Sequence, residues 1–203
     1  IIPGQRSYKE QLKVFIYLAL FSGLRKGELL ALEWADIDFE KDVVTVSKSV
    51  GYTKGEQFVK VPKTKHSFRK VTIPHFLTQR IKAMKTDRLR YRLSVGDFWQ
   101  GGEWLFIQEN GKLMNYSTPY QAFHDSILRY NECHPEPLPV IPLHGLRHTS
   151  ATLLIANNQD IRSVSARLGH AETSTTLNIY THFLESTDKK SADILENVLA
   201  KQA

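Results

Sequence analysis

The sequence is poor in the features that stabilise or locate a protein by means other than a hydrophobic core. Its 203 residues include one cysteine, Cys133, which excludes an internal disulfide framework and Cys-rich zinc sites and is typical of a reducing, intracellular setting. The longest apolar run, 14–21, is far shorter than the roughly 18 residues that indicate a membrane span. Residues 1–4 lack the charged start and the apolar stretch of a signal peptide. We therefore expect a cytoplasmic protein with no membrane partner.

The motifs of several enzyme classes are also missing. The sequence has no Gly-rich phosphate loop of the Walker type and no Gly-x-Ser-x-Gly elbow, which argues against an NTPase or a serine hydrolase. His144 and His148 are four residues apart and could share a zinc ion, but no Glu or Cys accompanies them at ligand spacing. The sequence therefore predicts neither a metal nor a cofactor.

The positive charge is concentrated in one part of the chain. Overall, 27 Lys and Arg stand against 21 Asp and Glu, a formal net charge of +6. The segment 54–92 holds 12 of the basic residues and two acidic ones, a local net charge of +10, so the rest of the chain is slightly acidic. Such a segment attracts polyanions, although a solvated basic helix face would give the same count. Because 76–92 has few apolar residues to insert into a membrane, nucleic acid is the favoured partner.

The hydrophobic periodicity predicts an α+β fold that is mainly helical, and the length and ordinary composition predict one domain over 1–203. We expect helices over 8–22, 26–33, 76–91, 117–130, 143–156, 161–168, 173–180 and 189–201, with 134–142 as an ordered linker. Alternating residues predict strands at 43–50, 58–61 and 71–73, which together make a small three-stranded antiparallel sheet. The Asn110-Gly111 pair predicts a short hairpin between 104–107 and 112–114.

Four short segments carry residue types that suit a phosphodiester. They are 22–28 with Arg25, 62–65 with Lys63, 144–148 with His144 and Arg147, and 168–182 with His170 and Tyr180. Arginine is a planar, always charged donor that can grip a phosphate with two parallel hydrogen bonds. Taken singly, each residue has a structural alternative, such as a surface ion pair, a capping histidine or a packing tyrosine. Only the combination indicates a site.

That combination resembles the catalytic domain of the tyrosine recombinase (phage integrase) family. The matching stretches are SGLRKGELLALEW (22–34), VPKTKHSFRKVTIP (61–74), LHGLRHTSATLL (143–154), LGH (168–170) and STTLNIYTH (174–182). They occur in the family's order and cover nearly the whole chain, from about residue 8 to residue 184. The phrasing is similar to that of integrases from Gram-positive phages and conjugative transposons.

The resemblance implies a catalytic set and a role for each member. The six residues are Arg25, Lys63, His144, Arg147, His170 and Tyr180. Tyr180 would attack the scissile phosphate to form a 3′-phosphotyrosyl link, with His144 as proton acceptor or organiser. The two arginines would hold the non-bridging oxygens, His170 would add a hydrogen bond, and Lys63 would protonate the leaving 5′-oxygen. The family's Pro-Lys-Thr pattern favours Lys63 over Lys65 as the catalytic lysine.

Further residues and partners follow from the same resemblance. Glu28 and His148 are expected to support the site, and the DNA-binding candidates are Lys54, Lys60, Lys65, Arg69 and Lys70. Because phosphotyrosine conserves the phosphodiester's energy, no ATP, metal or other cofactor is expected. The expected partners are double-stranded DNA, other protomers of a recombination tetramer reached through a tail helix at 185–203, and accessory directionality factors, all at the bacterial nucleoid.

Two other functions remain open at this point, and the chain itself is expected to be part of a longer protein. A type IB topoisomerase-like enzyme would share the chemistry but nick and religate without exchanging partners. A non-catalytic DNA-binding module would reuse only the basic surface. The family's N-terminal core-binding and arm-binding domains have no counterpart in this sequence, and the missing initial methionine agrees with a fragment.

Overall fold

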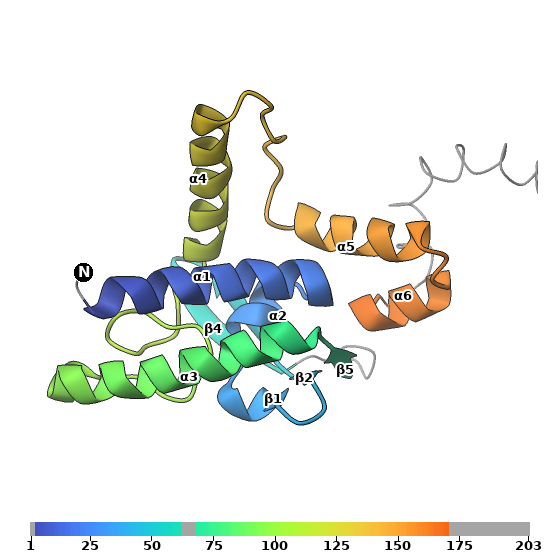
Figure 1. Cartoon of the computed structure of the whole chain (residues 1–203). Coiled ribbons are helices and arrows are strands. Elements are labelled where there is room, and N and C mark those ends of the chain that lie inside the picture. The colour runs from blue at the N-terminus through green and yellow to red at the C-terminus, as the bar shows by residue number, and fades with distance from the viewer. Residues whose placement is uncertain (1–2, 62–67, 171–203) are drawn as a thin grey trace, which may run out of the picture.

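The computed structural model describes residues 3–61 and 68–170. Its α-helices are α1 (Pro3–Ser22), α2 (Lys26–Leu30), α3 (His75–Val95), α4 (Thr118–Cys133), α5 (Gly145–Ala156) and α6 (Ile161–Leu168) (Figure 1). Its strands are β1 (Ile37–Asp38), β2 (Val43–Val46), β3 (Ser49–Thr53), β4 (Glu56–Lys60) and β5 (Arg69–Thr72), and two 3₁₀ turns are η1 (Trp34–Asp36) and η3 (Gly96–Phe98). The predicted mainly helical α+β fold is therefore confirmed. The predicted helices at 173–180 and 189–201, and the tail at 185–203, lie outside the described residues.

Helix α1 is the centre of the packing. Its residues Val14, Phe15 and Leu18 are fully buried, because apolar residues three and four apart line one face of a helix. The Phe15 ring meets Phe106 edge to face, with 4.8 Å between the ring centroids. Helix α3 lies alongside α1, α4 crosses it at a steep angle, and α2 and α5 also pack against it (Figure 1). One continuous core thus joins the N-terminal helices to the segments that follow the sheet.

The small sheet has three antiparallel strands, as predicted, but its members differ. Its order is β1-β2-β5, with Val44 paired to Ile37 on one side and to Val71 on the other. The expected single strand at 43–50 is wrong, because it divides into β2 and β3 around Lys48. That side chain is largely buried and pairs with Glu33 and Asp36, so the chain leaves the sheet at this point.

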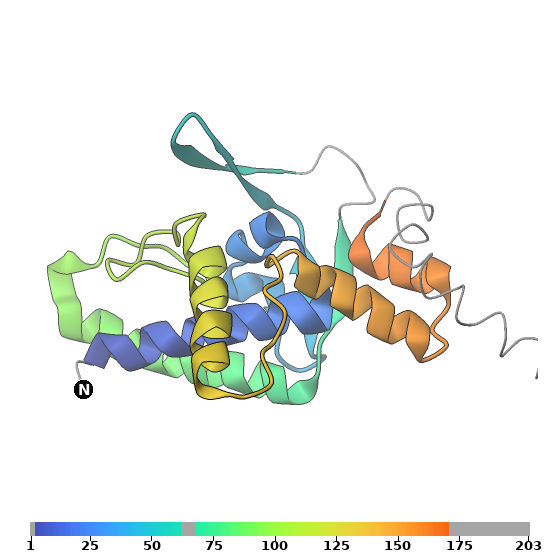
Figure 2. The ribbon, with the colours of Figure 1, turned by 90° about the horizontal axis from the view of Figure 1, so that it is seen from above.

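Strands β3 and β4 form a separate hairpin that extends away from the body of the protein (Figure 2). Its turn residues, Lys54 and Gly55, both have positive φ (49° and 88°), as the two-residue turn of a hairpin requires. Gln57 fixes the hairpin to the body, donating to the Leu113 carbonyl (3.4 Å) and accepting from the Tyr116 N–H (3.1 Å). The strand predicted at 58–61 therefore pairs in this hairpin and not in the three-stranded sheet.

Most helix boundaries differ from the predictions by a few residues. Helix α6 has the predicted bounds, because Asp160 accepts a hydrogen bond from the Ser163 N–H (2.9 Å) and Gly169 ends the helix with φ of 71°. The predicted hairpin around Asn110-Gly111 is reduced to one isolated bridge, between Ile107 and Leu113, and Trp104 instead forms an isolated bridge with Glu33. Within 3–61 and 68–170, no helix has both the length and the apolar character needed to cross a bilayer.

Arg88, a residue of the basic segment, belongs to the interior. Arg88 of α3 is 5% exposed and donates to the carbonyls of Trp104 and Leu105, both at 3.1 Å. It also reaches the Gln11 side chain (3.4 Å), which in turn bonds both backbone groups of Ile107. This network connects α1, α3 and the 104–107 segment with buried hydrogen bonds.

The Arg88→Met substitution is expected to destabilise the protein by about 2–4 kcal/mol, because it leaves two buried carbonyls without a donor. Urea unfolding followed by circular dichroism measures the loss. The matched control is the exposed Arg90, which lies two residues further along the same helix. Arg90→Met should change the free energy of unfolding by less than about 0.5 kcal/mol. Equal effects of the two substitutions would show that the Arg88 network contributes nothing specific.

Candidate functional site

Three helix ends meet at the turn that follows α1. The turn is made by Gly23, whose φ of 66° is accessible to glycine at little cost. A Cβ at Gly23 would lie 2.4 Å from the Leu168 side chain, so the glycine also lets the end of α6 pack against the turn. Arg25 then occupies the N-cap position of α2, between two helices as predicted.

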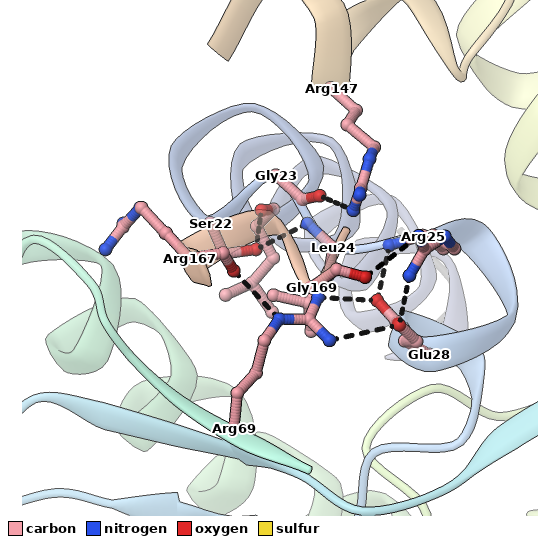
Figure 3. A network of polar contacts seen from close by, with 10 residues as sticks. Ser22, Gly23, Leu24, Arg25, Glu28, Arg69, Arg147, Arg167 and Gly169 are labelled. Atoms are coloured by element: carbon pink, nitrogen blue, oxygen red, sulfur yellow. Dashed lines mark hydrogen bonds and ion pairs between the residues drawn. The ribbon is translucent and has the colours of Figure 1, made fainter. Parts of the chain in front are cut away.

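Arg147 reaches this turn from α5 and is almost completely buried. Arg147 is 2% exposed, and its Nη1 donates to the Gly23 carbonyl at 2.7 Å (Figure 3). The other terminal nitrogen, Nη2, is buried with no hydrogen-bond partner among the described residues. Burial, followed by the charge of Arg25, lowers the pKa of Arg147 to about 9, which leaves the group charged at neutral pH. A buried cation with an unpaired N–H is suited to receive an anion.

Arg25 is held by two acceptors and remains partly exposed. Its Nη1 donates to Glu28 Oε1 (3.1 Å) and its Nη2 to the Gly169 carbonyl (3.2 Å). Its backbone N–H donates to Glu28 Oε2 (2.8 Å), which closes the first turn of α2. Since the side chain is 41% exposed, its other N–H groups can bind a ligand from solvent.

Glu28 is a buried carboxylate shared by two arginines. Arg69 donates from Nη2 to Oε2 (2.8 Å) and from Nη1 to Oε1 (3.1 Å), the oxygen that Arg25 also contacts (Figure 3). Burial alone would raise the pKa of Glu28, but the hydrogen bonds and charge of Arg69, with those of Arg25, bring that pKa below its usual value. The carboxylate is therefore ionised at neutral pH.

Two of the predicted histidines, His170 and His144, lie within electrostatic reach of Arg147 and Arg25. His170 follows Gly169, and its pKa is lowered to about 4 by burial and then by the charges of Arg147, Arg25 and Arg69. His144 precedes α5, and burial and then the neighbouring His148, Arg147 and Arg25 lower its pKa. Both imidazoles are therefore neutral at pH 7, and each can donate one hydrogen bond or accept one proton.

His148 lies behind His144. The two rings meet edge to face with their centroids 4.8 Å apart, and His148 Nδ1 is buried without a hydrogen-bond partner in the described part of the chain. The structure thus brings together Arg25, Glu28, His144, Arg147, His148 and His170. Lys63, Lys65 and Tyr180 lie outside the described residues.

The remaining DNA-binding candidates are in two different environments. Lys54, Lys60 and Lys70 are exposed, the first two on the projecting hairpin. The side chain of Arg69 is only 7% exposed and is engaged with Glu28 and the Arg167 carbonyl. The strand alternation indicates this inward orientation, because residues two apart in a strand share a face and Val71 is buried.

Sequence reasoning missed Arg167, which no local pattern marks. Its Nη2 donates to the carbonyls of Phe21 and Thr72, both at 2.8 Å, and so ties α6 to the end of α1 and to β5. Arg25 and Arg69 pair with the buried Glu28 carboxylate, and the charge of Arg147 also lies within its electrostatic reach. Three guanidinium groups near one carboxylate leave an excess of positive charge, which favours binding of an anion such as phosphate. No group of three or more His, Cys, Asp or Glu that could hold a metal occurs within 3–61 and 68–170.

Comparison with known proteins identifies the family. The sequence profile described as the phage integrase family matches residues 3–186. A XerC-like tyrosine recombinase of Caldanaerobacter subterraneus subsp. tengcongensis is 30% identical over 93% of this chain and 50% of its own length. The ICEBs1 integrase of Bacillus subtilis is 32% identical over 92% of this chain and 49% of its own. The transposase from transposon Tn916 of Enterococcus faecalis is 26% identical over 82% of this chain and 41% of its own.

Solved structures share the fold. A Tn1549 transposon integrase in complex with transposon right end DNA superposes with a TM-score of 0.75 at 24% identity, covering 97% of this chain and 65% of that one. XerH site-specific recombinase bound to difH substrate gives a TM-score of 0.63 at 24% identity, covering 94% of this chain and 48% of that one. The chain spans about half the length of the curated relatives it matches.

The ionised Glu28 predicts a specific acid sensitivity. Its folded pKa lies below the unfolded value of about 4.3, so its contribution to stability is complete above that value and is lost as the pH falls through the folded pKa. Glu28→Gln should therefore lower the free energy of unfolding by about 1–3 kcal/mol at pH 7. The difference in the free energy of unfolding between wild type and variant should become smaller below about pH 4. Urea unfolding between pH 3 and pH 7 measures both.

The exposed Glu40 is the matched control, because its carboxylate makes no ion pair with any described residue. Glu40→Gln should follow the wild-type pH profile. A gap between wild type and Glu28→Gln that stays constant from pH 7 to pH 3 would contradict the ionised, doubly paired state of Glu28.

Proposed function

The chain belongs to the phage integrase family, and we propose that it is a site-specific DNA recombinase that cleaves and rejoins strands through a 3′-phosphotyrosyl intermediate. The observation that carries the proposal is the guanidinium of Arg147, buried with an unpaired Nη2 beside the partly exposed Arg25. Two fixed positive charges with free N–H groups match the two non-bridging oxygens of a phosphodiester.

The scissile phosphate binds between these groups. Arg25 and Arg147 neutralise the charge that develops in the pentacoordinate transition state, and the neutral His170 donates one further hydrogen bond. Donors held in place before the reaction act without reorganisation, and removal of one such donor costs roughly 10²- to 10³-fold in rate in other enzymes. Glu28 keeps Arg25 in place, and His148 supports His144.

The chemical step needs residues beyond this cluster. The Tyr180 hydroxyl attacks phosphorus, its proton passes to the neutral His144, and the bond from phosphorus to the 5′-oxygen breaks. Lys63 donates a proton to that leaving oxygen, so the products are a 3′-phosphotyrosyl link and a free 5′-hydroxyl. An ordinary tyrosine has a pKa of about 10 and is a weak nucleophile, which is why a proton acceptor is needed. A 5′-hydroxyl attacking the link reverses the step, so neither ATP nor a metal is consumed.

Double-stranded DNA is the proposed partner. The relatives solved with DNA, the Tn1549 integrase and XerH, share this fold, and the exposed Lys54 and Lys60 of the hairpin and Lys70 of β5 give this chain basic groups for phosphate contacts. Lys65 of the same segment is proposed to join them. On DNA, we propose that this catalytic domain assembles with further protomers through 185–203, and with accessory directionality factors, at the nucleoid in the bacterial cytoplasm.

A trapped covalent adduct tests the proposed nucleophile. A nicked duplex with randomised sequence around the nick loses its short 5′-hydroxyl fragment after cleavage, so any intermediate accumulates. Wild-type protein should give a denaturation-resistant protein–DNA adduct whose modified peptide, identified by mass spectrometry, contains Tyr180. Tyr180→Phe should give none, and Arg147→Lys should lower the rate roughly 10²- to 10³-fold.

The exposed Tyr130 of α4 is the matched control, and Tyr130→Phe should react at the wild-type rate. An adduct that persists in Tyr180→Phe would overturn the assignment of the nucleophile. No adduct from wild-type protein on saturating DNA would favour the non-catalytic DNA-binding module. Relaxation of supercoiled DNA without joining of two different duplexes would favour the topoisomerase-like enzyme.

The exposed lysines of the hairpin predict the salt dependence of DNA binding. Each phosphate contact releases a counterion, so log Kd depends on log salt concentration with a slope of about 0.9 per contact. Replacement of Lys54 and Lys60 by glutamine should reduce this slope by about 1–2 and weaken binding at low salt, measured by fluorescence anisotropy with a mixed-sequence duplex. Lys41→Gln, on the β1–β2 turn, is the control. An unchanged slope in the double variant would remove the hairpin from the DNA interface.

A further inference from the structure

Arg69 is a charged residue whose three kinds of nitrogen are all used inside the protein. It is the first residue of β5, and its Nε donates to the Arg167 carbonyl at 2.8 Å. Its Nη1 and Nη2 donate to the two oxygens of Glu28 at 3.1 and 2.8 Å. With a side chain only 7% exposed, its guanidinium faces the interior and not the surface on which DNA is proposed to bind.

The two acceptors of Arg69 belong to the two segments that hold Arg25. Glu28 accepts from Arg25 Nη1, and the turn after Arg167 supplies the Gly169 carbonyl that accepts from Arg25 Nη2. Figure 3 shows the resulting closed ring of contacts, which runs from Arg69 through Glu28 and Arg25 to Gly169 and back to Arg69 through the Arg167 carbonyl. Both contacts that orient Arg25 therefore depend on one side chain.

The Arg69 guanidinium also packs closely against the Gly169 turn. A Cβ at Gly169 would lie 2.8 Å from Arg69 Nη1, so this glycine allows the guanidinium to lie against the turn. Gly169 also has φ of 71° and ends α6. The position of the turn, and with it the position of His170, is thus set against the Arg69 side chain.

We propose that Arg69 is a positioning residue, which fixes Arg25 and the Gly169 turn in the geometry that receives the scissile phosphate. This inference rests on the proposed function, because that function assigns the phosphate to Arg25. An arginine side chain that is 41% exposed would otherwise sample several rotamers, and a donor that must be ordered during the reaction stabilises the transition state less. Arg69 acts through its neighbours and does not itself touch the DNA.

The Arg69→Lys substitution separates the effect of side-chain geometry from the effect of charge. Its single ammonium can stay opposite Glu28, but it cannot also span the distance to the Arg167 carbonyl as a planar fork does. The Arg69→Lys variant therefore keeps the charge balance of the site and loses the connection between its two halves. Arg69→Gln loses both.

The test compares both variants with wild type in single-turnover adduct formation on saturating nicked duplex. Arg69→Lys should slow the reaction at least 10-fold, and Arg69→Gln more, while the Kd for DNA changes less than about threefold and its salt slope stays the same. Arg90→Lys and Arg90→Gln, at an exposed arginine that among the described residues pairs with Asp87 alone, are the controls and should retain the wild-type rate.

The pH profile gives a readout that a purely structural role would not change. Glu28 pairs with Arg25 and Arg69 and interacts with the charge of Arg147, and Arg69 is the largest of the influences that keep the pKa of Glu28 low. In Arg69→Gln the acid limb of the single-turnover rate should move to higher pH, and in Arg69→Lys it should move back toward the wild-type position. If Arg69→Gln unfolds, Arg69→Lys still carries the test, because it keeps a charge opposite the buried carboxylate.

Three results would overturn the inference. One is a wild-type rate in Arg69→Lys, and another is an equal loss of rate in the Arg90 controls. The third is a weaker Kd whose salt slope falls by about one in Arg69→Lys, because that marks a direct phosphate contact.

Failure of the proposed function is recognised separately, by the absence of any adduct from wild-type protein. Binding of inorganic phosphate, measured by ³¹P line broadening, then still tests the positioning of Arg25. Arg69→Lys and Arg25→Lys should each weaken it about 10-fold relative to wild type, and unchanged phosphate affinity in Arg69→Lys would overturn the inference.

Discussion

The buried carboxylate of Glu28 is the constraint on which the rest of the site depends. A charge removed from water must be paired, and Glu28 is paired by two arginines that come from different parts of the chain, the α2 N-cap and the start of β5. Its position fixes the spacing of the helical and sheet parts. Arg147 approaches the same point from α5 and meets a backbone carbonyl, so its positive charge is not cancelled there. The site therefore keeps an excess of positive charge while its geometry is fixed by one negative group.

The packing around this group depends on close backbone approach. Gly27 lets the Val50 carbonyl come near α2, where a Cβ would lie 2.4 Å from that oxygen, and Gly23 and Gly169 let the Leu168 and Arg69 side chains lie against the backbone at the ends of α1 and α6. The same contacts place the start of the projecting hairpin beside α2. A side chain at any of these positions would move an element that carries a residue of the site.

Local signals in the sequence predicted part of this arrangement and could not predict the rest. Helix α6 has clear start and stop signals in Asp160 and Gly169, and its bounds were predicted correctly. The division of 43–50 into two strands depends on Lys48 pairing with Glu33 and Asp36, which are distant in sequence. Arg69 was grouped with surface lysines because charge usually indicates exposure, although its alternation with Val71 pointed inward. The convergence of Arg25, His144, Arg147 and His170 follows from the family order of the motifs, whereas their supporting contacts are tertiary.

The hydrogen-bond acceptors of the site have a consequence for how it tolerates mutation. The carbonyls of Gly23, Arg167 and Gly169 accept from Arg147, Arg69 and Arg25, and every residue type supplies a carbonyl. Amino-acid replacement at such positions cannot delete the acceptor and can act only by changing the backbone conformation. Glu28 is the one acceptor in this ring that a single codon change can abolish. Mutations can therefore replace residues that supply these carbonyls while the pattern of hydrogen-bond donors and acceptors is kept.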